Sequence, residues 1–316
     1  MHAAVVHTLG QPPRSQDFAD PIPNNDEVLI HVRAAGLHPI VRALANGSHY
    51  SSSGEVPMVA GIDAVGTRLD GVRVYCGGPR RPWGTMAELC AAPSSMCVPL
   101  PDGIDDLQAA AIANPGMSAL LALKDRAAVA SGETVLILGA TGVAGQLAIQ
   151  LARIFGAKRV IAAGRNVEAL AGANVDAIIP LAEPEEKIRE AFAAEVSNGI
   201  DVIIDYLWGR PTELLLDSLI KSFNPRGSRS IRLVEVGQSA GPTLTLPGAA
   251  LRSVDLKIMG GGFGAIPLDK ILGAIPLLFD MAATGKLRVE VEPVPLADVE
   301  SAWSRSEKGR RIVFKV

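Results

Sequence analysis

Short apolar runs alternate with helical patterns through the middle of the chain. Runs of four to six residues that show no regular polar alternation are typical of strands covered on both faces. The predicted strands are Thr134–Leu138, Arg159–Ala163, Ala177–Pro180, Asp201–Asp205, Ile231–Val236 and Leu256–Met259. Helical patterns separate most of them, including Pro184–Ser197 and Thr212–Ser222. This alternation predicts an α/β fold with a doubly wound parallel sheet.

The first 118 residues have a different texture. They hold 12 of the 22 prolines, against six in residues 119–262. Because proline fixes φ and removes a donor from a sheet ladder, we predict turns and edge strands there rather than helices. The apolar runs are short, at Glu27–Val32, Val72–Cys76 and Thr85–Cys90. An irregular, partly barrel-like β domain fits this pattern, and we predict a helix only at Met117–Ala128.

The C-terminal part returns to the first texture. After Gly264 come a helix at Leu268–Ala283, an apolar segment at Leu287–Pro295, a short helix near Val299 and a closing strand at Arg311–Val316. We predict that this tail completes the β domain. The expected organisation is a first part of the β domain in residues 1–118, a parallel-sheet domain in residues 119–264 and a returning part in residues 265–316.

Length, composition and charge limit the function classes. At 316 residues the chain exceeds the size at which one hydrophobic core usually stops growing, so two domains are expected. A formal net charge of −3 gives no electrostatic basis for binding nucleic acid. No apolar run of about 18 residues predicts a membrane span, and the N-terminal residues lack the layout of a secretory signal. Three cysteines, Cys76, Cys90 and Cys97, suit a reducing compartment, so we expect a cytoplasmic location.

The strongest chemical signal follows the first predicted parallel strand. Gly139, Gly142 and Gly145 form a turn from that strand into an apolar helix that ends at Gly156. Glycines let the backbone turn tightly and approach a pyrophosphate, and a helix N-terminus offers free N–H groups with a partial positive charge. The G-x-x-G-x-x-G spacing alone is a weak signal, because a tight packing turn needs similar glycines. A strand, this turn, a helix and a second strand in that order predict a dinucleotide site.

The end of the second strand decides between the two nicotinamide dinucleotides. An NAD site carries an Asp or Glu about 20 residues past the glycines, which accepts hydrogen bonds from the ribose hydroxyls. Arg165 stands at that distance from Gly145, and no acid lies between them. A guanidinium binds a 2′-phosphate through charge-assisted bonds, whereas a carboxylate repels it. We therefore predict NADP(H) as the cofactor; the alternative is an Arg165 side chain that only faces water.

Five segments follow one another in an order that is itself informative. They are Val32–Pro39 (VRAAGLHP), Ala60–Gly66 (AGIDAVG), Gly84–Glu88 (GTMAE), Asn114–Leu120 (NPGMSAL) and the glycine turn. Together they resemble the zinc-independent, quinone-oxidoreductase-like branch of the medium-chain dehydrogenase/reductase superfamily. The resemblance implies a Rossmann domain inserted into a mostly β, GroES-like catalytic domain, and homodimers formed through the last strand of the parallel sheet. Short-chain dehydrogenases are excluded, because none of Tyr50, Tyr75 or Tyr206 has a lysine four positions later.

Further cofactor contacts are expected at strand ends, where open parallel sheets bind ligands. The segments at these ends are Asp205–Gly209, Val236–Ser239 and Met259–Gly264. The resemblance implies that the last two flank the nicotinamide and that Ser118 touches its carboxamide. The expected cofactor residues are Ser118, Thr141, Gly142, Val143, Ala144, Gly164, Arg165, Asn166, Tyr206, Leu207, Val236, Gly237, Gln238, Gly261, Gly262 and Phe263.

The zinc enzymes of the same superfamily bind their catalytic metal at positions that hold His38, Ile62 and Asn114 here. Catalytic zinc needs three protein ligands, and isoleucine cannot coordinate. All five histidines precede residue 50 and no Cys-x-x-Cys occurs, so we expect no metal. Without a Lewis acid to stabilise charge on oxygen, the expected substrate is a quinone or an α,β-unsaturated carbonyl, in which conjugation disperses the charge.

Few side chains can orient or protonate such a substrate. Tyr50 matches a pocket tyrosine of the quinone-oxidoreductase-like proteins, and His38 stands where they commonly carry asparagine. Histidine can donate a proton near neutral pH, whereas asparagine can only form a hydrogen bond. The simpler alternatives are a loop aromatic for Tyr50 and a turn residue satisfied by the backbone for His38. We take Tyr50, His38 and Asn114 as candidate catalytic residues.

Three functions remain open. The first is an NADPH-dependent reductase of quinones or enones. The second is an alcohol or carbonyl dehydrogenase of the same fold, which the missing zinc ligands disfavour. The third is an NADPH-binding regulator without turnover, because a fold does not fix a function. The expected partner is a small carbonyl or quinone molecule, with neither nucleic acid nor membrane.

Overall fold

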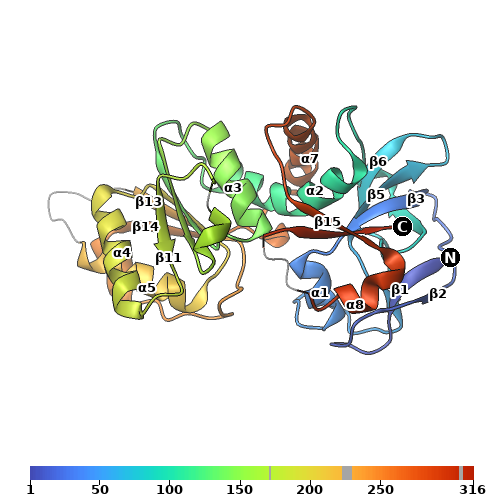
Figure 1. Ribbon diagram of the computed structural model, residues 1–316, viewed down its shortest axis with the longest axis horizontal. Helices are drawn as coiled ribbons and strands as arrows, with labels where there is room; N and C mark the ends of the chain where they lie inside the picture. Colours follow the sequence, from blue (N-terminus) through green and yellow to red (C-terminus); the bar gives the residue numbers. More distant parts are fainter. Residues whose placement is uncertain (171, 223–229, 306–308) are drawn as a thin grey trace. The chain divides into compact units, whose positions relative to one another are not determined.

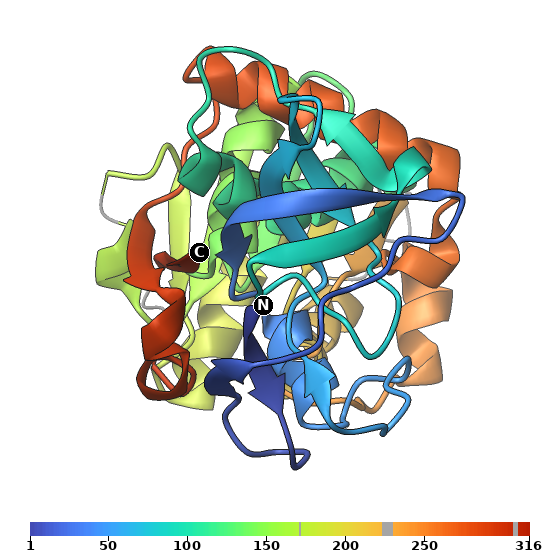
Figure 2. The same ribbon diagram turned by 90° about the vertical axis from the view of Figure 1, so that its right-hand side faces the viewer.

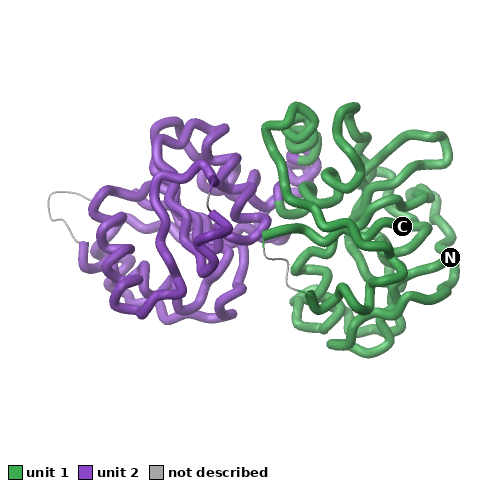
Figure 3. The backbone as a smooth tube through the Cα atoms, viewed as in Figure 1, with its two compact units in different colours: residues 1–115, 275–316 green, residues 116–274 purple. Residues whose placement is uncertain are grey.

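The computed structural model describes residues 1–170, 172–222, 230–305 and 309–316. These residues form two compact units (Figure 1, Figure 3). Unit 1 comprises residues 1–115 and 275–316, and unit 2 comprises residues 116–274. Unit 1 is therefore built from both ends of the chain, and unit 2 is one continuous insertion. Within the described ranges, no helix is both long enough and apolar enough to cross a membrane.

Unit 2 contains a six-stranded sheet in which every neighbouring pair is parallel. Its order is β11 (Ala177–Pro180), β10 (Arg159–Gly164), β9 (Thr134–Leu138), β12 (Val202–Asp205), β13 (Ser230–Glu235) and β14 (Asp255–Gly260). All six predicted strands are present, with bounds that differ by one residue at most. The direction of strand succession reverses between β9 and β12, and ligands of doubly wound sheets bind beyond the carboxyl ends of the strands at such a point.

Helices of unit 2 pack against this sheet and supply the crossovers between its strands. They are α3 (Val143–Ile154), α4 (Glu185–Asn198), α5 (Gly209–Lys221) and α6 (Gly248–Ser253), with short helical turns at Val167–Leu170 and Phe263–Ala265. The helix α3 contacts β9 and β10, and α4 and α5 lie side by side (Figure 1). Phe192 of α4 packs with Leu136 and Leu138 of β9 in the core. The strands lack polar alternation because this core needs apolar side chains from them.

Unit 1 is a β domain with two sheets (Figure 2). The larger sheet runs β15 (Val291–Pro295), β16 (Arg311–Lys315), β3 (Glu27–Gly36), β5 (Asp63–Arg68), β6 (Arg73–Gly77) and β8 (Cys97–Pro99), and β7 (Leu89–Pro93) also pairs with β3. The smaller one runs β2 (Arg14–Asp17), β1 (His2–Val6) and β4 (Met58–Val59). Phe314 of β16 lies opposite Ala35 of β3, so a strand from the C-terminal part pairs with one from the N-terminal part in this sheet.

The structure differs from the sequence prediction in two places of unit 1. Residues before 119 do form helices, α1 (Pro39–Ala45) and most of α2 (Asp106–Leu121), which a short π-helical turn continues to Arg126. Proline is tolerated in the first turn of a helix, where its missing N–H needs no partner, so the proline of α1 does not exclude a helix. The predicted run from Thr85 is irregular at first. The backbone of Met86 hydrogen-bonds to Ala4 and Ala60, which lie in different parts of the chain, and the regular strand β7 starts only at Leu89. Helix α7 (Leu268–Ala283) and the short α8 (Val299–Ala302) lie where predicted.

Candidate functional site

The three glycines after β9 are needed for different physical reasons. Gly139 has φ +85°, and a Cβ there would lie 3.1 Å from Cβ of Tyr206. Gly145 lets α3 approach the turn closely, because a Cβ at 145 would lie 2.4 Å from the Gly139 oxygen. A Cβ on Gly142 would meet only that same oxygen, at 3.5 Å, which is an ordinary contact. Packing within the protein therefore does not require glycine at position 142, and the space beside it is open to a ligand.

The N-terminus of α3 begins at this open position. Gly142 is the N-cap residue, no side chain caps the helix, and the first turn holds no acidic residue. The Gln146 N–H donates to the Gly142 oxygen at 2.9 Å, so the N–H groups of Val143 and Ala144 precede the first bond within the helix. Such groups need partners from outside the helix and carry the positive end of its dipole. This end of α3 is suited to an anion such as a pyrophosphate.

The end of β10 lies against the same turn. A Cβ on Gly164 would lie 2.6 Å from Cγ2 of Thr141, so the threonine side chain covers this glycine. Arg165 and Asn166 follow and are exposed. No described carboxylate forms an ion pair with Arg165. The structure thus joins Thr141 and Gly164 directly and leaves the guanidinium of Arg165 available to a phosphate.

Asp205, at the end of β12, organises the next part of this edge. Its side chain is fully buried, and its Oδ1 accepts hydrogen bonds from the N–H groups of Leu207 and Trp208 at 2.8 and 2.9 Å. Its Oδ2 accepts the Thr212 hydroxyl at 2.6 Å. Burial raises the pKa of Asp205, and the three hydrogen bonds to the carboxylate oppose that change. They fix a loop in which Trp208 has the uncommon φ of +55°.

The loop after β13 is tied to the loop after β12. The Tyr206 oxygen accepts the Ser239 hydroxyl at 2.9 Å, and a Cβ on Gly237 would lie 3.2 Å from that oxygen. The Val236 N–H donates to the Asp205 oxygen at 2.8 Å. These contacts bring the predicted residues of the two strand ends, Tyr206, Leu207, Val236, Gly237 and Gln238, into one region.

The end of β14 joins the same edge of the sheet. The Gly261 N–H donates to the Glu235 oxygen at 2.6 Å, and a Cβ on Gly261 would lie 3.1 Å from that oxygen. Gly262 begins the short helical turn that carries Phe263, whose side chain is half exposed. Burial raises the pKa of the neighbouring Glu235, and the charge of Asp205 adds to this rise. The carboxyl ends of β9, β10, β12, β13 and β14 therefore carry nearly all of the predicted cofactor residues.

Ser118 is the predicted cofactor residue that comes from helix α2. It lies beside the buried hydroxyl of Tyr206. Burial raises the pKa of Tyr206, and a hydrogen bond with Ser118 opposes part of that rise. Tyr206 is therefore a neutral phenol that can hold the serine hydroxyl in one place.

The three candidate catalytic residues all belong to unit 1. Tyr50 follows α1, is 81% exposed and stacks on His49, with ring centroids 4.1 Å apart. Asn114 lies on α2 and is half-buried, and His38 is the N-cap residue of α1 with a fully buried ring. Among the described residues, no hydrogen bond or ring contact joins any two of these three.

A buried polar network surrounds His38 instead. Nε2 of His38 lies 3.3 Å from Oδ1 of Asp63, close enough for an ion pair, although neither ring nitrogen hydrogen-bonds to a described residue. The hydroxyl of Tyr75 donates to Oδ2 of Asp63 at 2.9 Å. Burial raises the pKa of Tyr75 well above its ordinary value, and the charge of Asp63 adds to that. Sequence reasoning missed this network; the only available signal was an acid at the buried start of a strand.

The described part of the chain holds no group of three or more His, Cys, Asp or Glu side chains arranged for a metal. Ile62, at a ligand position of the zinc enzymes, packs against the apolar core of unit 1. The three cysteines are free thiols, and burial raises the pKa of Cys97 to about 12. Cys97 is therefore not a reactive thiolate near neutral pH.

Known proteins share this fold and much of this sequence. No family model matches the chain. A probable NADPH-dependent quinone reductase of Emericella nidulans is 27% identical over 99% of both chains. The quinone oxidoreductase of Sus scrofa is 34% identical over 60% of each chain. The crystal structure of the quinone oxidoreductase from Thermus thermophilus, also solved with NADPH, is 27% identical and superposes with a TM-score of 0.82 over 100% of both chains. The chain belongs to the medium-chain dehydrogenase/reductase superfamily, in its quinone-oxidoreductase branch.

Proposed function

We propose that this protein is an NADPH-dependent oxidoreductase that reduces a quinone or an α,β-unsaturated carbonyl without a metal. The observation that carries the proposal is the carboxyl-terminal edge of the parallel sheet in unit 2, at which β9, β10, β12, β13 and β14 end. We call this region the cofactor edge. An open glycine, an uncapped helix N-terminus and an exposed arginine lie there in the order that a dinucleotide needs. One relative described above is named a probable NADPH-dependent quinone reductase, and another is a quinone oxidoreductase solved with NADPH, which supports the same activity for this chain.

The residues of this edge fit NADPH. The N–H groups of Val143 and Ala144 would hold the pyrophosphate at the N-terminus of α3. Arg165 would bind the 2′-phosphate, and Thr141 would close the turn over Gly164. Ser118, held by Tyr206, would accept or donate a hydrogen bond at the carboxamide. NADPH, when bound, supplies the hydride; the protein binds it, orients it and keeps water away.

Metal independence is part of the proposal and rests on the donor set. Ile62 offers no donor atom at one of the three ligand positions, and His38 already faces Asp63. Without a metal, a substrate oxygen depends on hydrogen bonds for charge stabilisation. A conjugated acceptor needs less of this help, which favours quinones and enones over isolated ketones. Tyr50, or secondarily His38, would orient or protonate the substrate oxygen, and Asn114 is the third candidate.

The test combines binding and turnover. NADPH is titrated into the purified protein, and its absorbance is then followed with 1,4-quinones, alkenals and secondary alcohols. We expect turnover with quinones or alkenals, no stoichiometric zinc by elemental analysis and unchanged rates after chelation. Activity with secondary alcohols alone would favour the alcohol dehydrogenase, and tight NADPH binding without any turnover would favour a regulator.

We also propose a cytoplasmic homodimer. β14 ends the parallel sheet of unit 2, and no described strand pairs with its outer edge. An open strand edge can pair with the same edge of a second copy across a two-fold axis. Light scattering should give twice the chain mass of 33.0 kDa. Lys257→Pro, in the middle of β14, should shift that mass toward the monomer if its N–H serves this interface; a dimer unchanged by the proline would place the interface elsewhere.

A further inference from the structure

Helix α1 and the loop after it form one connected piece that leads to Tyr50. Gly47, with φ +78°, turns the chain back toward the helix. The N–H groups of Ser48 and His49 then both donate to the Ala43 oxygen, at 3.0 and 3.2 Å. Tyr50 stacks on His49, so its ring is attached to the end of α1 even though it is exposed. The place of Tyr50 therefore depends on how α1 is held.

The start of α1 is held by the buried network. His38 precedes the helix, and its imidazole lies between Asp63 and the end of β3. A Cβ on Gly36 would lie 2.5 Å from Nε2 of His38, so only glycine leaves room for the ring. Since Asp63 also accepts the Tyr75 hydroxyl, the ring faces a carboxylate that is itself fixed. The buried imidazole thus packs the N-terminal end of the helix against the core of unit 1.

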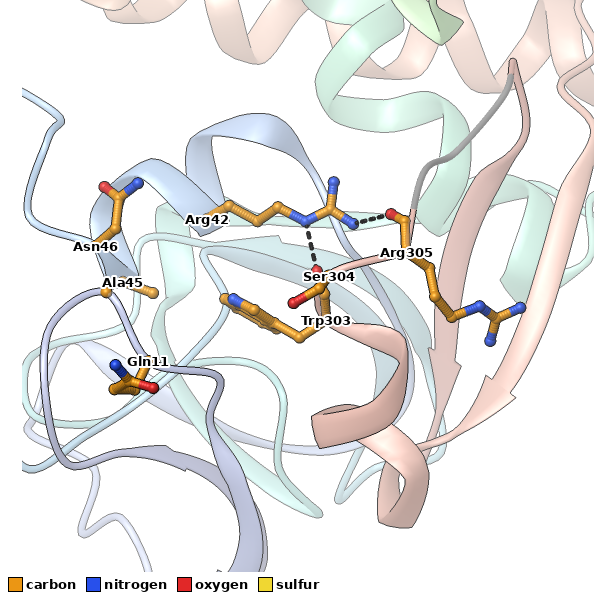
Figure 4. A pocket seen from close by; sticks show the side chains of 8 residues that line it. Gln11, Arg42, Ala45, Asn46, Trp303, Ser304 and Arg305 are labelled. Carbon is orange, nitrogen blue, oxygen red and sulfur yellow. Dashed lines mark hydrogen bonds between the residues drawn. The ribbon is translucent and has the colours of Figure 1, made fainter.

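The outer face of α1 is held by Arg42. Its Nε donates to the Trp303 oxygen at 3.0 Å, and one terminal nitrogen donates to the Arg305 oxygen at 3.1 Å (Figure 4). Both acceptors follow α8, more than 250 residues away in sequence. A pocket of about 260 Å³ lies beside this contact. It is lined by Ala45 and Asn46 at the end of α1 and by the segment 303–305. Arg42 bridges the two segments with charge-assisted bonds to carbonyls left free at a helix end.

We propose that Arg42 is a positioning residue for Tyr50. By tying α1 to the segment 303–305, it sets the place of the loop that carries the tyrosine, and the network of His38 and Asp63 holds the opposite end of the helix. The inference rests on the proposed reductase function, in which Tyr50 touches the substrate oxygen. Displacement of a substrate-contacting group by a fraction of an ångström to 1 Å lowers turnover strongly, so the tether matters for rate more than for binding.

A double-mutant cycle tests this role. We expect Arg42→Gln to lower kcat for the best quinone or enone about ten-fold, with unchanged affinity for NADPH. Arg42→Lys, which keeps the charge and one donor, should restore part of the rate. In a Tyr50→Phe background, Arg42→Gln should lower kcat no further, because the residue acts through the tyrosine hydroxyl. Arg80→Gln is the matched control, since Arg80 also donates to a backbone oxygen of unit 1, that of Ile22; it should leave kcat unchanged.

Amide hydrogen exchange separates the tether from the proposed activity. Arg42→Gln should speed exchange at Ser48 and His49, whereas Arg80→Gln should not. Additive losses of kcat in the cycle, an unchanged kcat in Arg42→Gln or an unaltered exchange pattern would each overturn the inference. If the unmodified protein turns over neither quinones nor enones, the proposed function fails, and the exchange experiment still decides whether Arg42 orders the loop.

Discussion

The cofactor edge of unit 2 and the catalytic candidates of unit 1 are built in contrasting ways. At the cofactor edge, five strand ends gather residues through backbone contacts such as those of Gly139, Gly237 and Gly261. In unit 1, Tyr50 is on an exposed loop, His38 faces the core and Asn114 is on a helix. In unit 1, side-chain contacts between segments far apart in sequence determine where the candidate residues lie. The difference shows that a site made by backbone topology is rigidly placed by the fold, whereas one made by loops needs separate anchors.

The largest expected effect tests the cofactor edge. We expect the unmodified protein to bind NADPH at least about ten-fold more tightly than NADH, and Arg165→Ala to erase most of that preference. A bidentate phosphate contact contributes about 1.5–3 kcal/mol, or roughly ten- to hundred-fold in Kd. Titration with both cofactors measures this, with NADH affinity as the internal control. Equal affinities in the unmodified protein would remove the assignment of the 2′-phosphate to this edge.

The next effect tests the loop of unit 1. Tyr50→Phe should slow enone reduction by about ten- to hundred-fold, because one neutral hydrogen bond to a conjugated substrate contributes on the order of 1–3 kcal/mol. Affinity for NADPH should not change, since the tyrosine is not part of the cofactor edge. Steady-state rates and NADPH titration check the two halves. A full rate in Tyr50→Phe would shift the role of donor to His38 or Asn114.

A pair of glycine variants separates packing from ligand binding within the edge. Gly145→Ala should lower the free energy of unfolding by about 1–3 kcal/mol, because its Cβ meets backbone atoms. Gly142→Ala should change it by less than about 1 kcal/mol, since nothing in the protein opposes that Cβ. Yet Gly142→Ala should weaken NADPH binding. Urea unfolding and NADPH titration compare the two variants. Equal destabilisation by both would mean that Gly142 serves packing alone.

The smallest expected effect is a pH dependence that comes from Asp205. Its pKa is raised in the folded protein because it is buried, so between the unfolded and folded pKa values the folded state binds more protons. The contribution of this group to stability is therefore present below the unfolded pKa and is lost as pH rises through the folded one. Asp205→Asn should remove this decline from a series of urea unfolding curves. If the free energy of unfolding instead rose through this pH range because of Asp205, the pKa of Asp205 would be lowered in the folded protein and not raised.

Local pattern predicted the parallel sheet, because each strand of unit 2 is a short apolar run whose ends are set by turn residues. It also indicates which strand ends meet, since the carboxyl ends of parallel strands lie at one edge whatever the loops do; the contacts of these residues with NADPH stay a prediction. The helix α1 was missed because its proline was read as a break, and the network of His38, Asp63 and Tyr75 was missed for a deeper reason. Its members come from three elements whose meeting depends on sheet register and on a glycine at 36. Arg42 and its acceptors, at the two ends of the chain, leave no local signal at all.

The pairing of β3 with β16 has a consequence for biosynthesis. Strand β3 precedes unit 2 in the chain, whereas its neighbour β16 follows unit 2 and is therefore synthesised later. All six strands of unit 2 are synthesised before β16, so this unit can fold on the ribosome while β3 still lacks its neighbour β16. During that interval the Ala34–Gly36 end of β3 lacks its partner, on the edge that β7 covers at Glu27–His31, and is open to other nascent chains. Deletion of β16 (Arg311–Lys315) would leave β3 without this partner permanently.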